Sequence, residues 1–592
     1  MHILGLSFFY HDSAAALLRD GEIIAAAEEE RFTRIKHDHN YPQMSIDFCL
    51  LQAGITFNDL DYVVFYEKPL VKFERVLMSI LSTFPNSWGS FGEAMIAWLD
   101  QKLWIKDLIL EKTGISPEKL LFSDHHMSHA ASAFLASPYE EAAILTLDGV
   151  GEWTTSSMGF GRASWKDGVN EIVLSHEERF PHSIGLLYST FTAFLGFEVN
   201  EGEYKVMGMS PYGEPRYIDK VEKLFKVYDD GSFWMDMDYF SYQYSPEKSF
   251  SRKFIKLFGE PRIHESEFFT PKTNPEVNPD SPKARENQYY ADVAASIQIA
   301  TEEAILKIAR TLSQKTRMKK LCFAGGVALN SKANGRLLTD GPFEEIYIQP
   351  SPGDSGGAIG AALYVYHVVL GKPRRWVQEH NFLGSEYNDA DIQAAINLKG
   401  YPYERIDDSE KLISRTVDDI IAGKVIGWYQ GRFEWGPRAL GNRSILADPR
   451  RAEMKNIVNS KIKFREPFRP FAPVILEKQT TRYFPTLKEP EKHYLPRFML
   501  AVLPWDETLG QEVPAVNHLG TGRLQTIRYE WNPWYYRLVE LFGEATSVPI
   551  IMNTSFNLRG EPIVTTPADA LRTFGNSGID TLVMGNYRVT KD

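Results

Sequence analysis

Cysteine is scarce in this chain, with only Cys49 and Cys322 among 592 residues. Two thiols are too few for a disulfide framework or a cysteine-rich zinc module, and such sparse usage is typical of a cytoplasmic protein. Long apolar runs are also missing, so the sequence predicts no transmembrane span. The opening residues, MHILGLSFFYHDSAAALL, lack a basic region and therefore indicate a first strand rather than a signal peptide.

Positive charge is in deficit, because 65 Lys and Arg stand against 77 Asp and Glu, a formal net charge of -12. This balance argues against broad contact with nucleic acid or a membrane surface. Any anionic ligand must then be bound by a local cluster of cations. The pattern GxxxxGK[ST] is absent as well, which excludes a P-loop nucleotide site. The length of the chain predicts two or three domains.

A degenerate repeat is present in the N-terminal half. The segments ILGLSFF, SAAALLRD and EIIAAAEEE predict three strands, with a tight turn at Asp20-Gly21. The segments AAILTLD, TTSSMGFGRA and NEIVLSH repeat this pattern with a turn at Asp167-Gly168, and both copies end in EERF. Charged EER runs often end strands, but matching turns favour a duplication. The expected fold is α/β, with the duplicated lobes of the actin-like ATPase and sugar-kinase fold.

Four side chains form a candidate metal site. His125 and His129 are four residues apart in DHHMSHAASAF, which places both imidazoles on one helix face. Asp148 ends the strand-like run AAILTLD, and Asp354 lies in the glycine loop SPGDSGG. Two histidines with carboxylates suit a catalytic Fe(II), Mn or Zn ion better than a closed structural site. A lone helical histidine is usually structural, and Asp354 could instead cap the following helix.

Two glycine turns, each between a predicted strand and a predicted helix, form the next candidate site. Gly325, Gly326 and Asn330 lie in AGGVALN, and Gly356 and Gly357 follow Asp354. Such turns direct backbone N–H groups toward phosphate, which predicts ATP binding. The alternative is that glycine serves these loops for conformational reasons alone.

The segment 432–469 reverses the overall charge, with ten Lys or Arg against four Asp or Glu. Most charge runs are solvated faces, but here rigid motifs, GPRALGNRSIL and FREPFRPFAP, separate the cations, as bidentate phosphate recognition requires. Later residues supply further donors. The predicted anion pocket consists of cations from this segment together with Arg523, Asn553 and Ser555.

Two N-terminal residues complete the candidates. His11 follows the first predicted strand and could be a general base, although a hydrogen-bonded turn histidine is an equal alternative. Lys36, just past EERFTRIK, could reach a phosphate, although exposed lysines are usually solvated.

These motifs together resemble the O-carbamoyltransferase family of nodulation-factor and antibiotic biosynthesis. The resemblance extends from about residue 3 to the last predicted strand. It is carried, in this order, by YHDSAAAL, EEERFTRIKHD, DHHMSHAASAF, EGEYKVMGMSPYG, GGVALN, PGDSGGAIGAAL, GPRALGNRSILADPR, FRPFAP and NTSFN.

The resemblance implies two domains. Residues 1–380 would form an actin-like carbamoyl-transfer domain, and residues 381–592 an α/β domain like the carbamoyl-adenylate-forming domain of tRNA threonylcarbamoylation. Carbamoyl phosphate and ATP, with Mg, would give carbamoyl adenylate in the second domain. A hydroxyl group of a sugar or other natural product would attack the adenylate in the first. A homodimer is compatible with this scheme.

The resemblance also implies residue roles. The metal, with Fe(II) favoured, would be held by His125, His129, Asp148 and Asp354. Carbamoyl phosphate and nucleotide would be bound in the predicted anion pocket by Arg438, Lys463, Arg469, Arg523, Asn553 and Ser555. His11 and Lys36 would line the transfer site. The main alternative function is a phosphotransferase of the sugar-kinase type, which leaves the cationic segment unexplained, and a non-enzymatic scaffold leaves the metal quartet unexplained as well.

Overall fold

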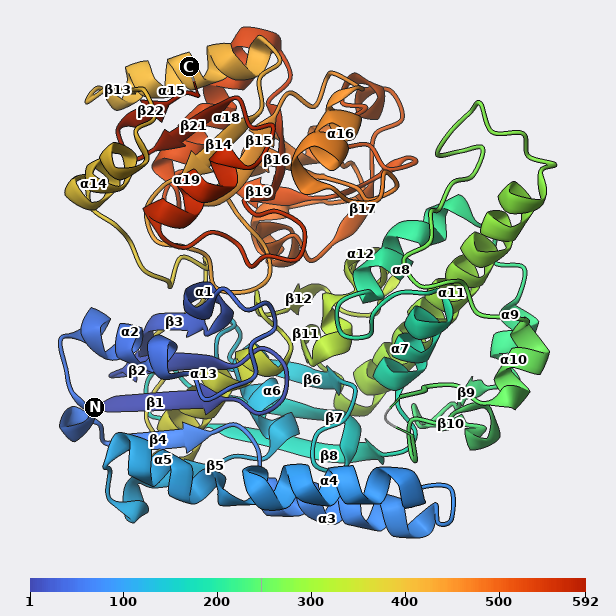
Figure 1. Ribbon diagram of the computed structural model, residues 1–592. Coiled ribbons are helices and arrows are strands. Elements are labelled where there is room, and N and C mark those ends of the chain that lie inside the picture. Colours follow the sequence, from blue (N-terminus) through green and yellow to red (C-terminus); the bar gives the residue numbers. More distant parts are fainter. Residues whose placement is uncertain (246, 592) are drawn as a thin grey trace. The chain divides into compact units, whose positions relative to one another are not determined.

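The computed structural model describes residues 1–245 and 247–591, and the chain divides into two compact units (Figure 1). Neither unit is continuous in sequence, unlike the expected domains 1–380 and 381–592. The last point at which the chain passes from unit 1 to unit 2 follows Val377, close to the expected boundary. Unit 1 consists of residues 1–10, 16–23 and 54–377, and unit 2 of residues 11–15, 24–53 and 378–592.

Two five-stranded sheets share one topology, which confirms the predicted duplication. The strand orders are β3-β2-β1-β4-β5 and β8-β7-β6-β11-β12. In each, three consecutive strands are neighbours, and two later strands join beside the first in parallel register, as in Leu4 opposite Val63 and Phe323 opposite Leu145. The bounds are β1 (His2–Ser7), β2 (Ala14–Arg19), β3 (Glu22–Glu28), β4 (Tyr62–Phe65), β5 (Leu120–Phe122), β6 (Glu141–Leu147), β7 (Thr154–Arg162), β8 (Glu171–Arg179), β11 (Lys320–Ala324) and β12 (Glu345–Tyr347).

Two helices of unit 1 fill the space beside these sheets. The helix α13 (Asp354–Tyr364) packs on β1 and β4, while α6 (His125–Phe134) packs on β6, β7 and β11, and the two helices pack on each other. In the contacts of α13 with β1 and with α6, the two backbones approach each other closely. A Cβ on Gly5 of β1 would lie 1.9 Å from the Ala358 carbonyl oxygen, and a Cβ on Gly360 would lie 1.9 Å from that of Ser128. The small residues of DSGGAIGAAL therefore allow α13 to approach both neighbours closely.

The remaining elements of unit 1 surround this arrangement. The long helix α11 (Pro282–Thr316) begins earlier than the predicted Tyr289, because Ser281 caps it and Pro282 suits its first turn. In the described parts of the chain, no helix is both long enough and apolar enough to cross a membrane. The other elements are α3 (Pro69–Ser82), α4 (Trp88–Asp100), α5 (Ile105–Thr113), α7 (Ile184–Phe194), α8 (Glu203–Met209), α9 (Ile218–Val221), α10 (Arg252–Phe258), α12 (Ser331–Asp340), β9 (Phe225–Val227) and β10 (Phe233–Met235).

Unit 2 is built on a mixed eight-stranded sheet, in the order β13-β22-β21-β14-β15-β20-β16-β19. This agrees with the predicted α/β domain, and the segments KVIGWYQ, APVILE and DTLVMG supply β14, β16 and β21. The strands are β13 (Tyr403–Arg405), β14 (Ile426–Tyr429), β15 (Arg443–Ala447), β16 (Ala472–Leu476), β19 (Gln525–Ile527), β20 (Ile550–Ser555), β21 (Thr581–Met584) and β22 (Tyr587–Val589), with β17 (Val502–Pro504) and β18 (Thr521–Arg523) forming a separate pair.

Helices cover this sheet and complete the core of unit 2. The helices α15 (Ser409–Ile421) and α18 (Pro533–Thr546) pack on each other, and their apolar faces bury Leu412, Leu538 and Phe542 against strand residues. Burying each such side chain contributes roughly 1.5–3 kcal/mol. The other helices are α1 (Glu30–Thr33), α2 (Gln43–Ala53), α14 (Asp389–Lys399), α16 (Met454–Ile457), α17 (Thr480–Tyr483) and α19 (Pro567–Gly575). Likeness to a threonylcarbamoyl-adenylate-forming domain stays a prediction.

Candidate metal centre and anion pocket

The four predicted metal ligands meet in the interior of unit 1. Their ligand atoms all lie within 4.8 Å of one another, and all four residues are buried. One turn of α6 brings Nε2 of His125 within 3.0 Å of Nε2 of His129. Nε2 of His125 is also 3.4 Å from Oδ2 of Asp148, which directly follows β6, and 3.5 Å from Oδ1 of Asp354. The residue preceding α13 is Gly353, so Asp354 is not its N-cap.

The chemistry of this quartet fits a divalent cation. Two imidazole nitrogens 3.0 Å apart repel each other when both are protonated, and two carboxylate oxygens converge on the same point. Burial raises the pKa of Asp148, but the neighbouring histidines outweigh that effect and hold the pKa well below its ordinary value. A buried set of two nitrogens and two carboxylates suits Fe(II), Mn or Zn.

Further residues around the quartet were not identified from the sequence. Tyr66 and Glu67 directly follow β4, and the Tyr66 hydroxyl donates to Oδ2 of Asp354 at 3.3 Å. Glu152 is buried and accepts from the backbone N–H of His125 at 3.0 Å. Burial, with Asp354 and Asp148 nearby, raises the pKa of Tyr10 above its ordinary value. A polar residue at the end of a buried strand, the signal that identified Asp148, was also available for Tyr66 and Glu67.

The two glycine turns lie beside the metal quartet, with different local roles. Gly325 has φ of +93°, and a Cβ there would lie 2.2 Å from the Leu147 carbonyl oxygen. The N–H of Gly326 donates to Oδ1 of Asp148 at 2.8 Å, so this turn orients a metal ligand. Asn330 caps α12 through the N–H of Ala333 and exchanges hydrogen bonds with Gln298.

Gly356 and Gly357 lie inside α13 and are buried. A Cβ on Gly356 would lie 2.0 Å from the Ser351 carbonyl oxygen, and one on Gly357 would lie 2.7 Å from the Tyr66 ring. Close packing therefore explains both glycines. A contact of either glycine turn with nucleotide stays a prediction.

The predicted cationic residues gather in unit 2. Burial, followed by Arg465, Arg469 and Lys36, lowers the pKa of Lys463 well below its ordinary value. Burial, followed by Arg438, Arg465 and Arg469, lowers that of Arg523. Each charged side chain that shifts the pKa of these two groups is itself a cation. This mutual repulsion is the property expected of a pocket that binds a compact anion. Arg465 is an addition to the predicted set.

Neutral groups hold the cations in place. Lys463 ends a π-helical turn, η8 (Val458–Lys463), and its ammonium donates to the carbonyl oxygen of Ser555 at 2.7 Å and to its hydroxyl at 3.1 Å. The Asn553 amide donates to Oε1 of Gln525 at 2.7 Å and to the Ala439 carbonyl oxygen at 3.1 Å. Asn553 and Ser555 therefore link the ends of β20 and η8 to the loop of Arg438. Single π-turns of this kind frequently occur at functional sites.

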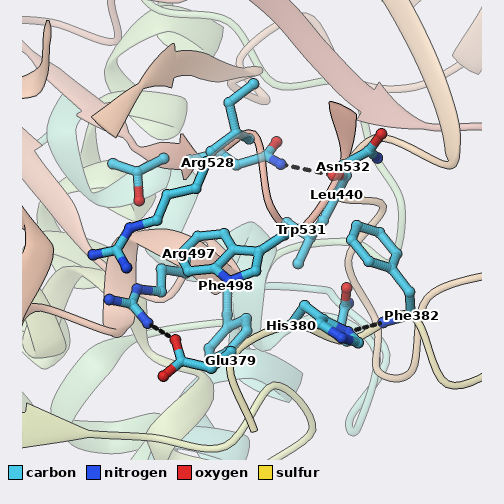
Figure 2. A pocket seen from close by; sticks show the side chains of 13 residues that line it. Glu379, His380, Phe382, Leu440, Arg497, Phe498, Arg528, Trp531 and Asn532 are labelled. Atoms are coloured by element: carbon cyan, nitrogen blue, oxygen red, sulfur yellow. Dashed lines mark hydrogen bonds and ion pairs between the residues drawn. The ribbon is translucent and has the colours of Figure 1, made fainter. Parts of the chain in front are cut away.

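A small cavity lies next to Gln525 in unit 2 (Figure 2). Its volume is about 20 Å³, room for about one water molecule. The guanidinium of Arg497 lies 4.6 Å from the centre of the Trp531 ring and pairs with Glu379. These groups are already paired, so the cavity is an internal feature of the fold and not a substrate pocket.

His11 and Lys36 both belong to unit 2, together with the cationic residues, whereas the sequence analysis assigned them to the transfer domain. The Asp12 carboxylate lies between two imidazoles, with Oδ2 3.1 Å from Nδ1 of His11 and Oδ1 2.7 Å from Nδ1 of His37. Burial raises the pKa of Asp12, but hydrogen bonds to His11 and His37 outweigh it and lower the pKa. Asp12 therefore orients His11, which the sequence analysis did not foresee.

Asp12, Glu30 and His37 form a second group whose ligand atoms lie within 4.8 Å of one another. Its members are already paired with one another. Asp12 contacts the His37 ring, and the backbone N–H of His37 donates to the Glu30 carboxylate at 2.9 Å. This group is an ion-pair network of half-buried residues, whereas the four residues of the quartet in unit 1 are all buried.

Comparison with known proteins gives a consistent result. The family described as Carbamoyltransferase N-terminus matches residues 2–363, and that described as Carbamoyltransferase C-terminus matches residues 417–591. An uncharacterized protein of Synechocystis sp., sll1178, is 44% identical over 100% of this chain and 97% of its own length. The nodulation protein NolNO of Sinorhizobium fredii is 38% identical over 98% of this chain and 79% of its own. The 3'-hydroxymethylcephem-O-carbamoyltransferase of Amycolatopsis lactamdurans is 31% identical over 45% and 48%.

Proposed function

Because the chain belongs to the carbamoyltransferase family, we propose that it transfers a carbamoyl group from carbamoyl phosphate, through carbamoyl adenylate, to a hydroxyl of a small molecule. The observation that supports the donor is the cationic pocket of unit 2, where the charged groups that shift the pKa values of Lys463 and Arg523 are all cations. Carbamoyl phosphate is a compact dianion, and fixed guanidinium groups recognise its phosphate oxygens in pairs.

The activation step assigned to this pocket uses ATP and one water molecule. Water breaks the bond between the carbonyl carbon and the phosphate oxygen and releases phosphate. The resulting carbamate oxygen attacks the α-phosphorus of ATP, forms the adenylate and releases pyrophosphate. The roles of Arg438, Lys463, Arg469 and Arg523 are to hold the donor and to stabilise the charge that develops on phosphate oxygens. Lys36, which acts electrostatically on Lys463, adds positive charge to the same pocket.

The transfer step is assigned to the quartet of unit 1. A divalent ion held by His125, His129, Asp148 and Asp354 would supply Lewis acidity toward a carbonyl or phosphate oxygen. Glu152 and the N–H of Gly326 position His125 and Asp148 through hydrogen bonds of 3.0 and 2.8 Å. In unit 2, the Asp12 carboxylate lies 3.1 Å from Nδ1 of His11 and orients its imidazole, and His11 is the proposed base of the reaction.

An acceptor-free reaction tests the activation step and separates it from the alternative kinase. Purified protein with Mg-ATP and labelled carbamoyl phosphate should release pyrophosphate and phosphate and no ADP. Omission of carbamoyl phosphate should stop pyrophosphate release. Formation of ADP would instead support a phosphotransferase, and pyrophosphate release that ignores carbamoyl phosphate would contradict the proposal.

The acceptor itself can be sought by mass spectrometry. Hydroxylated natural products, incubated with the protein, ATP and carbamoyl phosphate, should gain the mass of one carbamoyl group. Substitution of Asp148 by Asn should abolish that gain in any acceptor found.

A further inference from the structure

Glu67 is a buried carboxylate that contacts a metal-ligand histidine from behind. It directly follows β4 and is 4% exposed. Its Oε2 lies 3.4 Å from Nδ1 of His125 and 2.6 Å from Nζ of Lys72, in the first half of α3. The carboxylate is therefore fixed from one side by an ammonium group and faces the imidazole on the other.

The two nitrogens of the His125 ring have different surroundings. Nε2 faces the quartet, 3.4 Å from Asp148 and 3.5 Å from Asp354. Nδ1 faces Glu67. A neutral imidazole carries one proton, and the partner of one nitrogen decides where that proton sits. A carboxylate at Nδ1 retains the proton there, so the Nε2 lone pair points at the ion.

The second histidine of the quartet has no equivalent arrangement. Within residues 1–245 and 247–591, Nδ1 of both His125 and His129 is buried without a hydrogen bond, but only Nδ1 of His125 has a carboxylate contact, to Glu67 at 3.4 Å. The carboxylate support is thus specific to His125. Its backbone is held separately, by Glu152. One residue is therefore fixed at both its ring and its main chain, as expected for the ligand that anchors the site.

Fold stability alone is a poor reason for this arrangement. A buried ion pair such as Glu67–Lys72 carries a desolvation penalty that its attraction often fails to exceed, and apolar residues of equal volume can be as stabilising. Outer carboxylates that accept from a ligand histidine, in contrast, have a direct effect on the ion, because they orient the ring and increase its basicity.

We propose that Glu67, held by Lys72, is a positioning residue that fixes the tautomer of His125 and thereby tightens divalent-metal binding in unit 1. This inference rests on the proposed function, which places an ion at the quartet. It concerns affinity for the ion and is independent of the acceptor.

Metal titration of the full-length apo-protein tests this inference. Co(II) is the probe, because its visible absorption reports ligand geometry, and a chelator competition gives its Kd. Glu67→Ala should weaken Co(II) binding by about 10–100-fold and change the spectrum. The glutamine of Glu67→Gln has the same shape and still accepts from Nδ1–H through its carbonyl oxygen. The loss of Co(II) affinity in this variant should therefore be smaller than in Glu67→Ala.

Glu152→Gln is the matched control, because it removes a carboxylate that lies 3.0 Å from the backbone nitrogen of His125 and holds the backbone rather than the ring. It should bind Co(II) with a smaller loss and an unchanged spectrum. An equal loss in Glu152→Gln would show a general effect of negative charge and overturn the tautomer role. If Glu67→Ala fails to fold, the double variant Glu67→Met/Lys72→Met removes the acceptor without leaving an unpaired ammonium group, and unchanged affinity and spectrum in it would overturn the tautomer role.

The wild-type protein separates this inference from the proposed function. If wild type binds no Co(II), the metal site of the proposed function fails and this inference fails with it. If wild type binds Co(II) and the Glu67 variants bind equally tightly, only this inference fails.

Discussion

The two candidate sites of this protein are built with opposite charge. In unit 1, imidazole nitrogens and carboxylates converge in the interior. Gly5 and Gly360 let α13 approach β1 and α6 closely. In unit 2, arginines and lysines converge, and burial together with the neighbouring cations lowers the pKa values of Lys463 and Arg523. A chain of net charge -12 thus contains one cluster of cations, because local placement is independent of the overall balance.

The substitution with the largest expected effect tests whether the two sites act independently. His129→Ala removes a direct ligand, so metal affinity should fall by more than the roughly 100-fold upper range seen for outer contacts. Pyrophosphate release from ATP and carbamoyl phosphate should stay near the wild-type rate. Chelator competition and a pyrophosphate assay measure both. Loss of pyrophosphate release in a folded His129→Ala protein would mean that the sites do not act separately.

Arg523→Ala should give the converse result. Removal of one fixed cation from the pocket should lower carbamoyl-phosphate-dependent pyrophosphate release by about 100-fold, as for other preorganised charge-stabilising groups. Metal affinity should not change. Arg523→Lys should restore little of the pyrophosphate release, because a lysine cannot make the paired contacts of a guanidinium. Full activity in Arg523→Lys would argue that only charge matters there.

The smallest effect is a difference in proton exchange. Burial and nearby cations lower the pKa of Lys463, and a bound dianion favours the charged amine and raises the pKa again. Binding of carbamoyl phosphate should therefore take up a fraction of a proton, at pH values between the pKa of the free and of the bound state. Metal binding to the quartet should release protons, because ligands must be deprotonated.

Calorimetry in buffers of different ionisation enthalpy measures these opposite signs. Lys463→Met should lose the uptake that this lysine provides without altering the proton release on metal binding. Uptake that persists unchanged in Lys463→Met would assign the effect to another group.

A related pH effect concerns the fold around His11. Burial lowers the pKa of His37, but the Asp12 carboxylate outweighs this and raises it. The stability that this pair contributes is therefore fully present below the ordinary histidine pKa of about 6.5. It is lost as the pH rises through the higher folded pKa. In Asp12→Asn the pKa of His37 should return toward about 6.5, which NMR titration of the ring measures. An unshifted pKa would show that Asp12 does not hold His37.

Local sequence patterns were enough to predict the strands of the repeat and the closeness of the two histidines. Matching turns at Asp20-Gly21 and Asp167-Gly168 predicted a duplication that the two sheets confirm, because a tight turn and a strand pattern are local properties. Helical spacing brought His125 and His129 together for the same reason. The position of Asp148 followed from its place at the end of a buried strand.

Only the tertiary structure decided which distant residues share a site. It placed His11 and Lys36 in unit 2, identified Asp12 and Glu67 as partners of His11 and His125, and showed that Gly356 and Gly357 serve close helix packing. These relations depend on how strands and helices from separate parts of the chain pack. Periodicity and spacing describe neighbours along the chain, and they contain no information about which side chain lies behind an imidazole ring.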